Sequence, residues 1–247
     1  KAFAPLVKFD RFSRSTGIQV QNVGSGPIDI LVTFYGFAGA CAGQTYSQSQ
    51  DDVQPGASAI FNQMPGQTPL PADCSASAEI KTTTAGGLIA ALVSESYQFD
   101  KVPATGQRSV TSYAIPADSA TTLLSVPIFK DDRYDKRTGL QIQNVGTATA
   151  TDIVATFNCK GASTFTAIST PQTAAAGAAV QFYTPSDDTA KFEATAPFVS
   201  NDVVCGVSVT ADQPIVAIAN ESPIPGGTFE QDNNNYEGFN LVPTPQD

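Results

Sequence analysis

Residues 16–24 read Thr16-Gly17-Ile18-Gln19-Val20-Gln21-Asn22-Val23-Gly24, and the pattern returns as Thr138-Gly139-Leu140-Gln141-Ile142-Gln143-Asn144-Val145-Gly146, an offset of 122 residues between positions 16 and 138. In each copy two apolar residues alternate with two glutamines, which is the period of a β-strand with one buried face. The Asn-Val-Gly that follows tolerates positive φ, so each strand is predicted to end in a turn. We therefore interpret the chain as two copies of a module built around this strand.

Other segments recur at corresponding places in the two halves. The recurring pairs are 3–8 with 125–130, 10–14 with 132–137, 28–34 with 152–157, 76–83 with 203–209, and 88–96 with 214–222. No segment has a convincing helical period, and short strands separated by Gly, Pro and Asn turns are typical of antiparallel sandwiches. The sequence predicts an all-β chain of two tandem antiparallel Ig-like β-sandwich domains related by the internal repeat, residues 1–120 and 121–247.

Composition excludes several classes of function. The 247 residues carry a formal net charge of −10, so nucleic-acid phosphates and anionic membrane surfaces would be repelled. No apolar run is long enough to span a bilayer, so no membrane insertion is expected. The chain has no histidine, which removes Ser-His-Asp and Cys-His catalysis and His-ligated zinc. The composition does not exclude Ser-Lys or two-carboxylate mechanisms, but we expect a protein that is not an enzyme.

Four cysteines fall two to a module. Each first cysteine, Cys41 or Cys159, follows a Thr-Phe strand, and each second one, Cys74 or Cys205, belongs to the strand before the most apolar strand. We predict the disulfides Cys41–Cys74 and Cys159–Cys205, which place the protein in an oxidising, extracellular compartment. The competing interpretation is a Cys₄ metal site, which the absence of any Cys-x-x-Cys spacing disfavours.

Acidic residues offer one candidate metal site. Asp131, Asp132 and Asp135 form the densest acidic cluster, and calcium prefers carboxylate oxygens in secreted proteins. The cluster lacks the spacing of a known calcium loop, and solvated turn residues are the alternative interpretation. No other cofactor is expected.

Glu95 and Glu221 occupy equivalent places at the ends of the most apolar strands. A carboxylate there costs free energy unless it is paired. We predict structural ion pairs of Glu95 with Arg11 or Arg14, and of Glu221 with Arg133 or Arg137. A ligand site is the alternative, but recurrence in both modules favours a requirement of the scaffold.

These segments resemble a bacterial extracellular repeat with a Pro-Leu-Val start, an Ile-x-Val-Gln-Asn-x-Gly strand, a Val-Thr-Phe-Tyr strand and an Ile-Ala-Ala-x-Val-Asn-Glu strand. The matching segments are 5–7, 18–24, 32–35 and 89–96 in the first module, and 127–129, 140–146, 155–157 and 215–222 in the second. The four cysteines depart from that pattern. The resemblance implies a surface or appendage module of bacteria, with no catalytic residue to transfer.

The N-terminal segment is the candidate for assembly. Phe3, Pro5, Leu6, Val7 and Phe9 are apolar enough to need burial, and no domain in this sequence precedes them. Such a strand can complete its own sheet or that of a neighbour. We expect a secreted, non-enzymatic structural subunit of a bacterial filament or surface layer, which forms a homopolymer through strand addition or sandwich contacts. The alternative is an adhesin-like surface module that binds a carbohydrate or protein partner.

Overall fold

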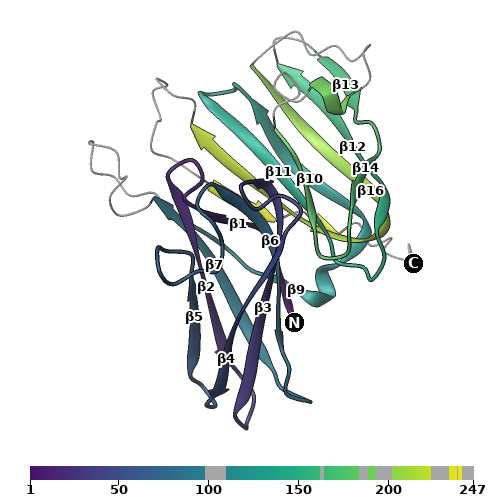
Figure 1. The fold of residues 1–247 in the computed structure, drawn as a ribbon. Helices are drawn as coiled ribbons and strands as arrows, with labels where there is room; N and C mark the ends of the chain where they lie inside the picture. Colours follow the sequence, from purple (N-terminus) through teal and green to yellow (C-terminus); the bar gives the residue numbers. More distant parts are fainter. Residues whose placement is uncertain are drawn as a thin grey trace. The chain divides into compact units, whose positions relative to one another are not determined.

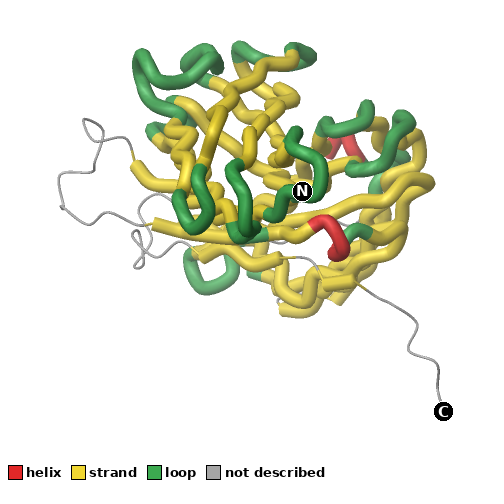
Figure 2. The backbone as a smooth tube through the Cα atoms, turned by 90° about the horizontal axis from the view of Figure 1, so that it is seen from below, coloured by secondary structure: helices red, strands yellow, loops and turns green. Residues whose placement is uncertain are grey.

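The computed structural model describes residues 1–97, 110–161, 164–183, 189–192, 202–223, 234–237 and 239–240. The chain divides into two compact units. Unit 1 comprises residues 1–118 with 177–179, and unit 2 comprises residues 119–176 with 180–247, so the division falls close to the boundary expected after residue 120. The described residues are mostly strand, and their helical segments are the short 3₁₀ turns Ala117–Ser119 and Thr189–Lys191 (Figure 2).

Unit 1 consists of two antiparallel sheets (Figure 1). The five-stranded sheet has the order β4-β3-β6-β1-β9, formed by β4 (Thr45–Val53), β3 (Ile28–Gly39), β6 (Cys74–Thr82), β1 (Ala2–Phe9) and β9 (Ile115–Pro116). The four-stranded sheet has the order β5-β2-β7-β8, formed by β5 (Ser58–Asn62), β2 (Arg14–Asn22), β7 (Ile89–Tyr97) and β8 (Val110–Tyr113). The described part of the chain is therefore all-β, as the sequence predicts.

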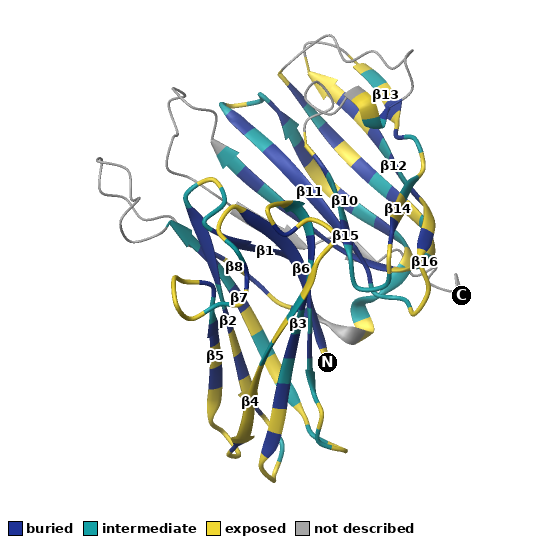
Figure 3. Cartoon of the chain, in the orientation of Figure 1, coloured by how far each residue is buried: buried dark blue, intermediate teal, exposed yellow. Residues whose placement is uncertain are grey.

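Alternation along the strands of unit 1 places a core between its two sheets. On β2, Ile18 and Val20 are buried while Gln19 and Gln21 are exposed, which confirms the alternation predicted for this strand. On the other sheet alternate residues of β3 are buried, and the change from buried to exposed is visible as bands along β3 and β5 in Figure 3. Each sheet thus contributes one apolar face, which is how two sheets remove apolar surface from water together.

In the described residues of unit 2, nine hydrogen-bonded strands form one continuous set. They are β10 (Thr121–Asp131), β11 (Lys136–Asn144), β12 (Ala150–Gly161), β13 (Thr164–Ile168), β14 (Gln172–Ala174), β15 (Ala179–Phe182), β16 (Val203–Pro223), β17 (Asn234–Glu237) and β18 (Phe239–Asn240). Four phenylalanines, Phe129, Phe157, Phe182 and Phe192, form edge-on or tilted ring contacts in its core.

A single strand of 21 residues, β16, replaces the two strands predicted at 203–209 and 214–222. Its first half pairs with β10 and β12, and its second half pairs with β11 and β17. The equivalent strands of unit 1, β6 and β7, are separated by a turn in which Gly86 has a φ of +74°. Residues 211–214 of unit 2 include no positive φ, so the backbone stays extended and the strand continues from one pairing to the next.

Strand order repeats between the units once β16 is counted in both pairings. The order β13-β12-β16-β10-β18 matches β4-β3-β6-β1-β9, and β15-β11-β16-β17 matches β5-β2-β7-β8. The sequence repeat therefore extends to the topology. One difference lies on β11, where Gln141 and Gln143 are buried although their counterparts Gln19 and Gln21 are exposed. The prediction of a single buried face is wrong for this strand.

An asparagine side chain organises the turn that follows β2 in unit 1 and the turn that follows β11 in unit 2. The Nδ2 group of Asn22 donates to the carbonyls of Gly26 and Val53 at 2.8 Å each, and its Oδ1 accepts from Gly24 N at 2.9 Å. Asn144 makes the same three bonds, to Ala148, Ala174 and Gly146, at 2.8, 2.9 and 3.0 Å. Both side chains are buried, and in each unit one of the three bonds, to Val53 or to Ala174, is buried as well, so these amides satisfy a buried carbonyl and fix the turn.

Replacing Asn22 with alanine is expected to lower the free energy of unfolding by about 2 kcal/mol, because the buried carbonyl of Val53 and two partly buried turn groups lose their partners. Urea unfolding of the full chain measures the loss. The control is Gln21→Ala, since Gln21 is exposed and makes one bond to Gly56, and we expect a change within about 0.5 kcal/mol. Equal losses for the two variants would contradict this role of Asn22.

Candidate functional site

A buried charged cluster joins the two sheets of unit 1. Lys8, on β1, places its Nζ 3.0 Å from Oε2 of Glu95, on β7. Arg14, at the start of β2, places its Nη1 3.5 Å from the other carboxylate oxygen of Glu95. All three residues are buried, and Glu95 is only 3% exposed. One carboxylate therefore balances two cations in a region of low dielectric, where each charge depends on the others.

Unit 2 repeats the core of this cluster. Nζ of Lys130, on β10, lies 2.7 Å from Oε2 of Glu221, on the second half of β16. The backbone around the lysine is fixed in the same way in both units, because Lys8 N donates to Thr16 Oγ1 and Lys130 N donates to Thr138 Oγ1, each at 2.9 Å. The cluster is thus part of the repeated scaffold.

The prediction for Glu95 is confirmed by Arg14, one of its two named partners, although Lys8 lies nearer to the carboxylate. Glu221 contacts Lys130, a partner that was not predicted. The signal was present in the sequence, because the recurring apolar segments 3–8 and 125–130 both end in lysine. Each lysine lies between two buried residues of its strand, and its Nζ contacts the glutamate near the end of β7 or of β16.

Arg11 and Arg133 form different pairs from those predicted. Arg11 Nη1 lies 2.7 Å from Asp73 Oδ1, and Arg133 Nη1 lies 2.7 Å from Asp202 Oδ1. The hydrogen bond to Asp202 raises the pKa of Arg133 above its ordinary value. Both arginines lie on the turns between β1 and β2 and between β10 and β11, where the chain reverses, and from there they reach the loops that precede β6 and β16.

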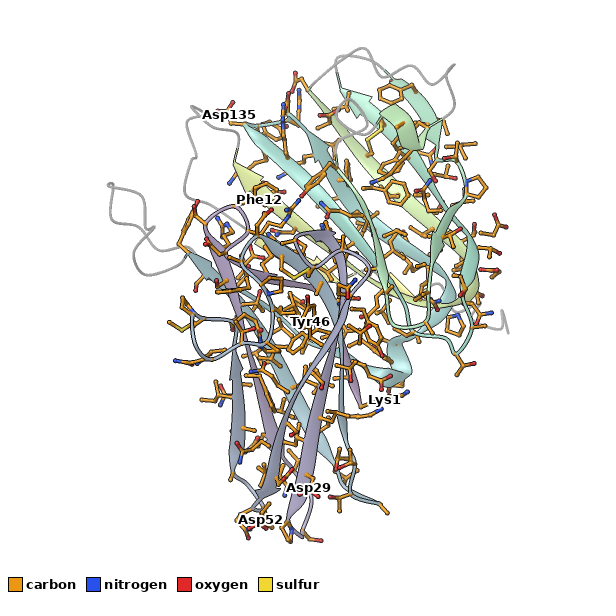
Figure 4. The ribbon with its side chains drawn as sticks, viewed as in Figure 1. Lys1, Phe12, Asp29, Tyr46, Asp52 and Asp135 are labelled. Atoms are coloured by element: carbon orange, nitrogen blue, oxygen red, sulfur yellow. A yellow bond between two sulfur atoms is a disulfide. The ribbon has the colours of Figure 1, made fainter. Side chains whose placement is uncertain are left out.

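Each of these two turns presents an exposed aromatic ring beneath its arginine. The guanidinium carbon of Arg11 lies 5.0 Å from the ring centre of Phe12, and that of Arg133 lies 4.6 Å from the ring centre of Tyr134. Phe12 and Tyr134 are 61% and 63% exposed, and both have positive φ, 53° and 56°. Figure 4 shows Phe12 at such a turn. Left-handed backbone costs free energy for an aromatic residue, and the cation–π contact offsets part of that cost.

The predicted calcium site does not form. Among the described residues no group of three acidic, cysteine or histidine side chains is placed to hold a metal ion. Asp131 is buried at the end of β10, Asp132 pairs with Arg137, and Asp135, labelled in Figure 4, lies on the turn with a φ of 55°. Burial of Asp131 and the pairing of Asp132 with Arg137 commit these carboxylates elsewhere, and the three are not gathered around one point.

Both predicted disulfides are present. Cys41 is bonded to Cys74, which ties the end of β3 to the start of β6, and Cys159 is bonded to Cys205, which ties β12 to the first half of β16. All four cysteines are buried. Formed disulfides indicate an oxidising compartment.

The segment expected to drive assembly lies inside its own sheet. Strand β1, which contains Phe3, Pro5, Leu6, Val7 and Phe9, pairs with β6 on one side and with β9 on the other. All eight of its residues are buried. The hydroxyl of Tyr113, on β8, donates to the carbonyl of Leu6. In this single chain β1 therefore completes its own sheet in unit 1, which is one of the two arrangements that the sequence left open.

A shallow hollow of about 650 Å³ opens on unit 2, lined by Asn158, Cys159, Lys160, Thr164, Phe165, Thr166, Val204 and Gly206. The hollow lies over β12, β13 and β16. A Cβ placed on Gly206 would meet nothing within 4 Å, so the missing side chain accounts for part of this space. Its lining includes an amide, two hydroxyls and one ammonium group. The Thr166 hydroxyl donates to Asn158 Oδ1 at 2.9 Å, and the remaining donors and acceptors can form hydrogen bonds to a polar partner.

No family model matches the chain, and no curated protein is significantly similar to it. A search of the described residues for a helix with the length and apolar character needed to cross a membrane found none.

Proposed function

We propose that the chain is a secreted, non-enzymatic structural subunit of a bacterial extracellular filament or surface layer, and that it assembles with copies of itself through strand addition or through contacts between sandwiches. We also infer that each unit is an Ig-like β-sandwich. Two antiparallel sheets around one core, with an internal disulfide, support this assignment for unit 1.

The observation that carries the proposal is the repetition of structural devices. Strand order, the buried Lys–Glu pair, the asparagine turn and the disulfide all recur in both units. Each recurring group bonds to another part of the same unit, so these residues serve the scaffold. Repeated disulfide-stapled modules suit a protein that must persist outside the cell.

A second candidate is an adhesin-like module that binds a carbohydrate or protein, and the hollow on unit 2 favours it. Asn158, Thr164 and Thr166 bring hydrogen-bonding groups to its rim, and Phe165 contributes a ring to its lining. Concave sites with a few polar groups are the usual form of ligand sites. An adhesin-like module must bind a ligand, and it does not need to assemble into a polymer.

Sedimentation velocity and negative-stain microscopy of the purified full chain separate the two candidates. A structural subunit should form particles much larger than the 25.7 kDa chain as its concentration rises. An adhesin should stay monomeric and bind glycans or a protein. Monomers at every concentration and ionic strength would overturn the proposal.

A further inference from the structure

The edge strand β4 of unit 1 lacks the usual protection against pairing over its first six residues, 45–50, which precede Asp51 and Asp52. It has nine residues, ends the order β4-β3-β6-β1-β9, and pairs only with β3 among the described residues. Residues 45–50 read Thr-Tyr-Ser-Gln-Ser-Gln, with no charge and no proline. The register irregularity of the β3–β4 pair lies beyond this stretch, between Ile28 and Ile30. Natural edge strands are commonly blunted by charges, prolines or bulges, so this stretch is open to another strand.

The edge strand β13 of unit 2 occupies the equivalent place in its own strand order. It ends the order β13-β12-β16-β10-β18 and reads Thr-Phe-Thr-Ala-Ile, again without charge or proline. Ile168, its last residue, is 50% exposed. The hollow described above lies beside this strand and includes Thr164, Phe165 and Thr166. Among the described residues β13 pairs only with β12, so this edge combines a side not paired with any described strand, exposed apolar surface and an adjoining recess.

We propose that β4 of one copy of the chain pairs antiparallel with β13 of a second copy. The proposal rests on the proposed self-assembling subunit and names the surfaces through which it assembles. One register covers the whole of β13 with five residues of β4. In that register Thr45 faces Ile168, Tyr46 faces Ala167, Ser47 faces Thr166, Gln48 faces Phe165, and Ser49 faces Thr164.

The faces of the two strands agree in this register. Tyr46 pairs with the buried Phe34 of β3, so its side chain lies on the core face of unit 1. Phe165 pairs with the buried Cys159 of β12, so it lies on the core face of unit 2. Paired strands therefore continue both core faces on one side and bring Tyr46 diagonally beside Phe165, within the reach of an aromatic contact.

The opposite faces of the two strands also match. Ser47 and Ser49 are exposed on β4, and Thr164 and Thr166 are exposed on β13. Small hydroxyl side chains opposite one another are favourable cross-strand pairs. The charge of the subunit does not oppose the contact locally, because Asp51 and Asp52 lie beyond the five residues that face β13.

The contact joins two different edges, so it is heterologous. A copy that has used its β4 still offers its β13, and the next copy adds in the same way. Such contacts produce a filament unless the rotation between copies closes a ring. Pairing of β4 with itself would instead stop at a dimer.

Engineered cysteines test the register directly. Full-length Ser47→Cys protein and Thr166→Cys protein are purified with their native disulfides intact, mixed and oxidised mildly. The two positions face each other at a separation that a disulfide spans. We expect about tenfold more mixed dimer than from the control mixture of Ser58→Cys and Thr166→Cys, because contact raises the effective concentration. Ser58 is an exposed residue of the other sheet's edge, β5. Equal yields from the two mixtures, or chiefly homodimers of Ser47→Cys, would overturn the proposal.

Charge substitutions provide a second test. Ser47→Lys with Ser49→Lys places two positive charges on the edge strand β4, and Thr164→Asp with Thr166→Asp places two negative charges on β13. Like charges on an edge strand disfavour its pairing with another strand. Each double variant alone should lose most of its sedimenting polymer, while mixing the two should restore assembly between the oppositely charged edges. The control, Ser58→Lys with Ile60→Lys on β5, should assemble as the unchanged chain does. Polymers from both double variants alone would overturn the edge pairing and leave the proposed function standing, whereas an unchanged chain that never assembles would overturn both.

Discussion

Replacing Glu95 with alanine should lower the free energy of unfolding by about 3–5 kcal/mol, the usual cost of breaking a buried ion pair from one side. The substitution removes the carboxylate that contacts both Lys8 and Arg14. Both cations are buried, at 7% exposure each, and neither can regain full hydration without opening the contact between the two sheets. Urea unfolding monitored by tyrosine fluorescence and far-ultraviolet circular dichroism measures the change in midpoint.

Two matched variants identify burial as the cause. Glu79 also contacts lysines, Lys1 and Lys81, but both of these are more than two-fifths exposed. Glu79→Ala should therefore cost no more than about 1 kcal/mol, as expected for surface pairs. Glu221→Ala should fall between the two, because its partner Lys130 is 20% exposed. A Glu95→Ala loss no larger than that of Glu79→Ala would show that the buried cluster adds nothing to stability.

Removing the disulfide of unit 2 by Cys159→Ala with Cys205→Ala should lower the free energy of unfolding by roughly 4 kcal/mol, the chain-entropy value for a loop of this size. The bond closes 46 residues and links two adjacent, buried strand positions. Its loss leaves the denatured chain far more conformations. Thermal and urea unfolding of the variant, followed beside the unchanged chain, measure the effect.

Reduction provides the control for this substitution. Because all four sulfurs are buried, a mild reductant should leave the folded chain oxidised, and both bonds should become reducible once urea unfolds it. The corresponding pair Cys41→Ala with Cys74→Ala closes 33 residues and should cost slightly less. Unchanged unfolding midpoints in both double variants would refute a stabilising role for these bonds.

The local pattern of the sequence predicted much of unit 1. Ile18 and Val20 face its core and Gln19 and Gln21 face outward, as their alternation indicates. The cysteine pairs followed from their matched places in the repeat. These features depend on side-chain period and on the order of segments along the chain, which are both written in the sequence.

The charged site was predicted only in part. The sequence identified Glu95 and Glu221 as carboxylates that require partners, because they recur in apolar strands. It did not identify Lys8 as the nearer partner of Glu95, since proximity in the repeat favoured the arginines of the following loop. Which cation reaches a carboxylate depends on the distance between two sheets, and strand period contains no information about that distance.

Sequence alone determined that this chain is built from β-strands in two related copies, because a period of two and a recurring set of turns are local properties. Tertiary structure alone decided three further features. Residues 203–223 form one strand where unit 1 has two, Gln141 and Gln143 are buried where Gln19 and Gln21 are exposed, and the aspartates at 131, 132 and 135 do not gather. Continuity of a strand, burial of its second face and convergence of side chains all depend on segments distant in sequence, which the period of a single strand does not record.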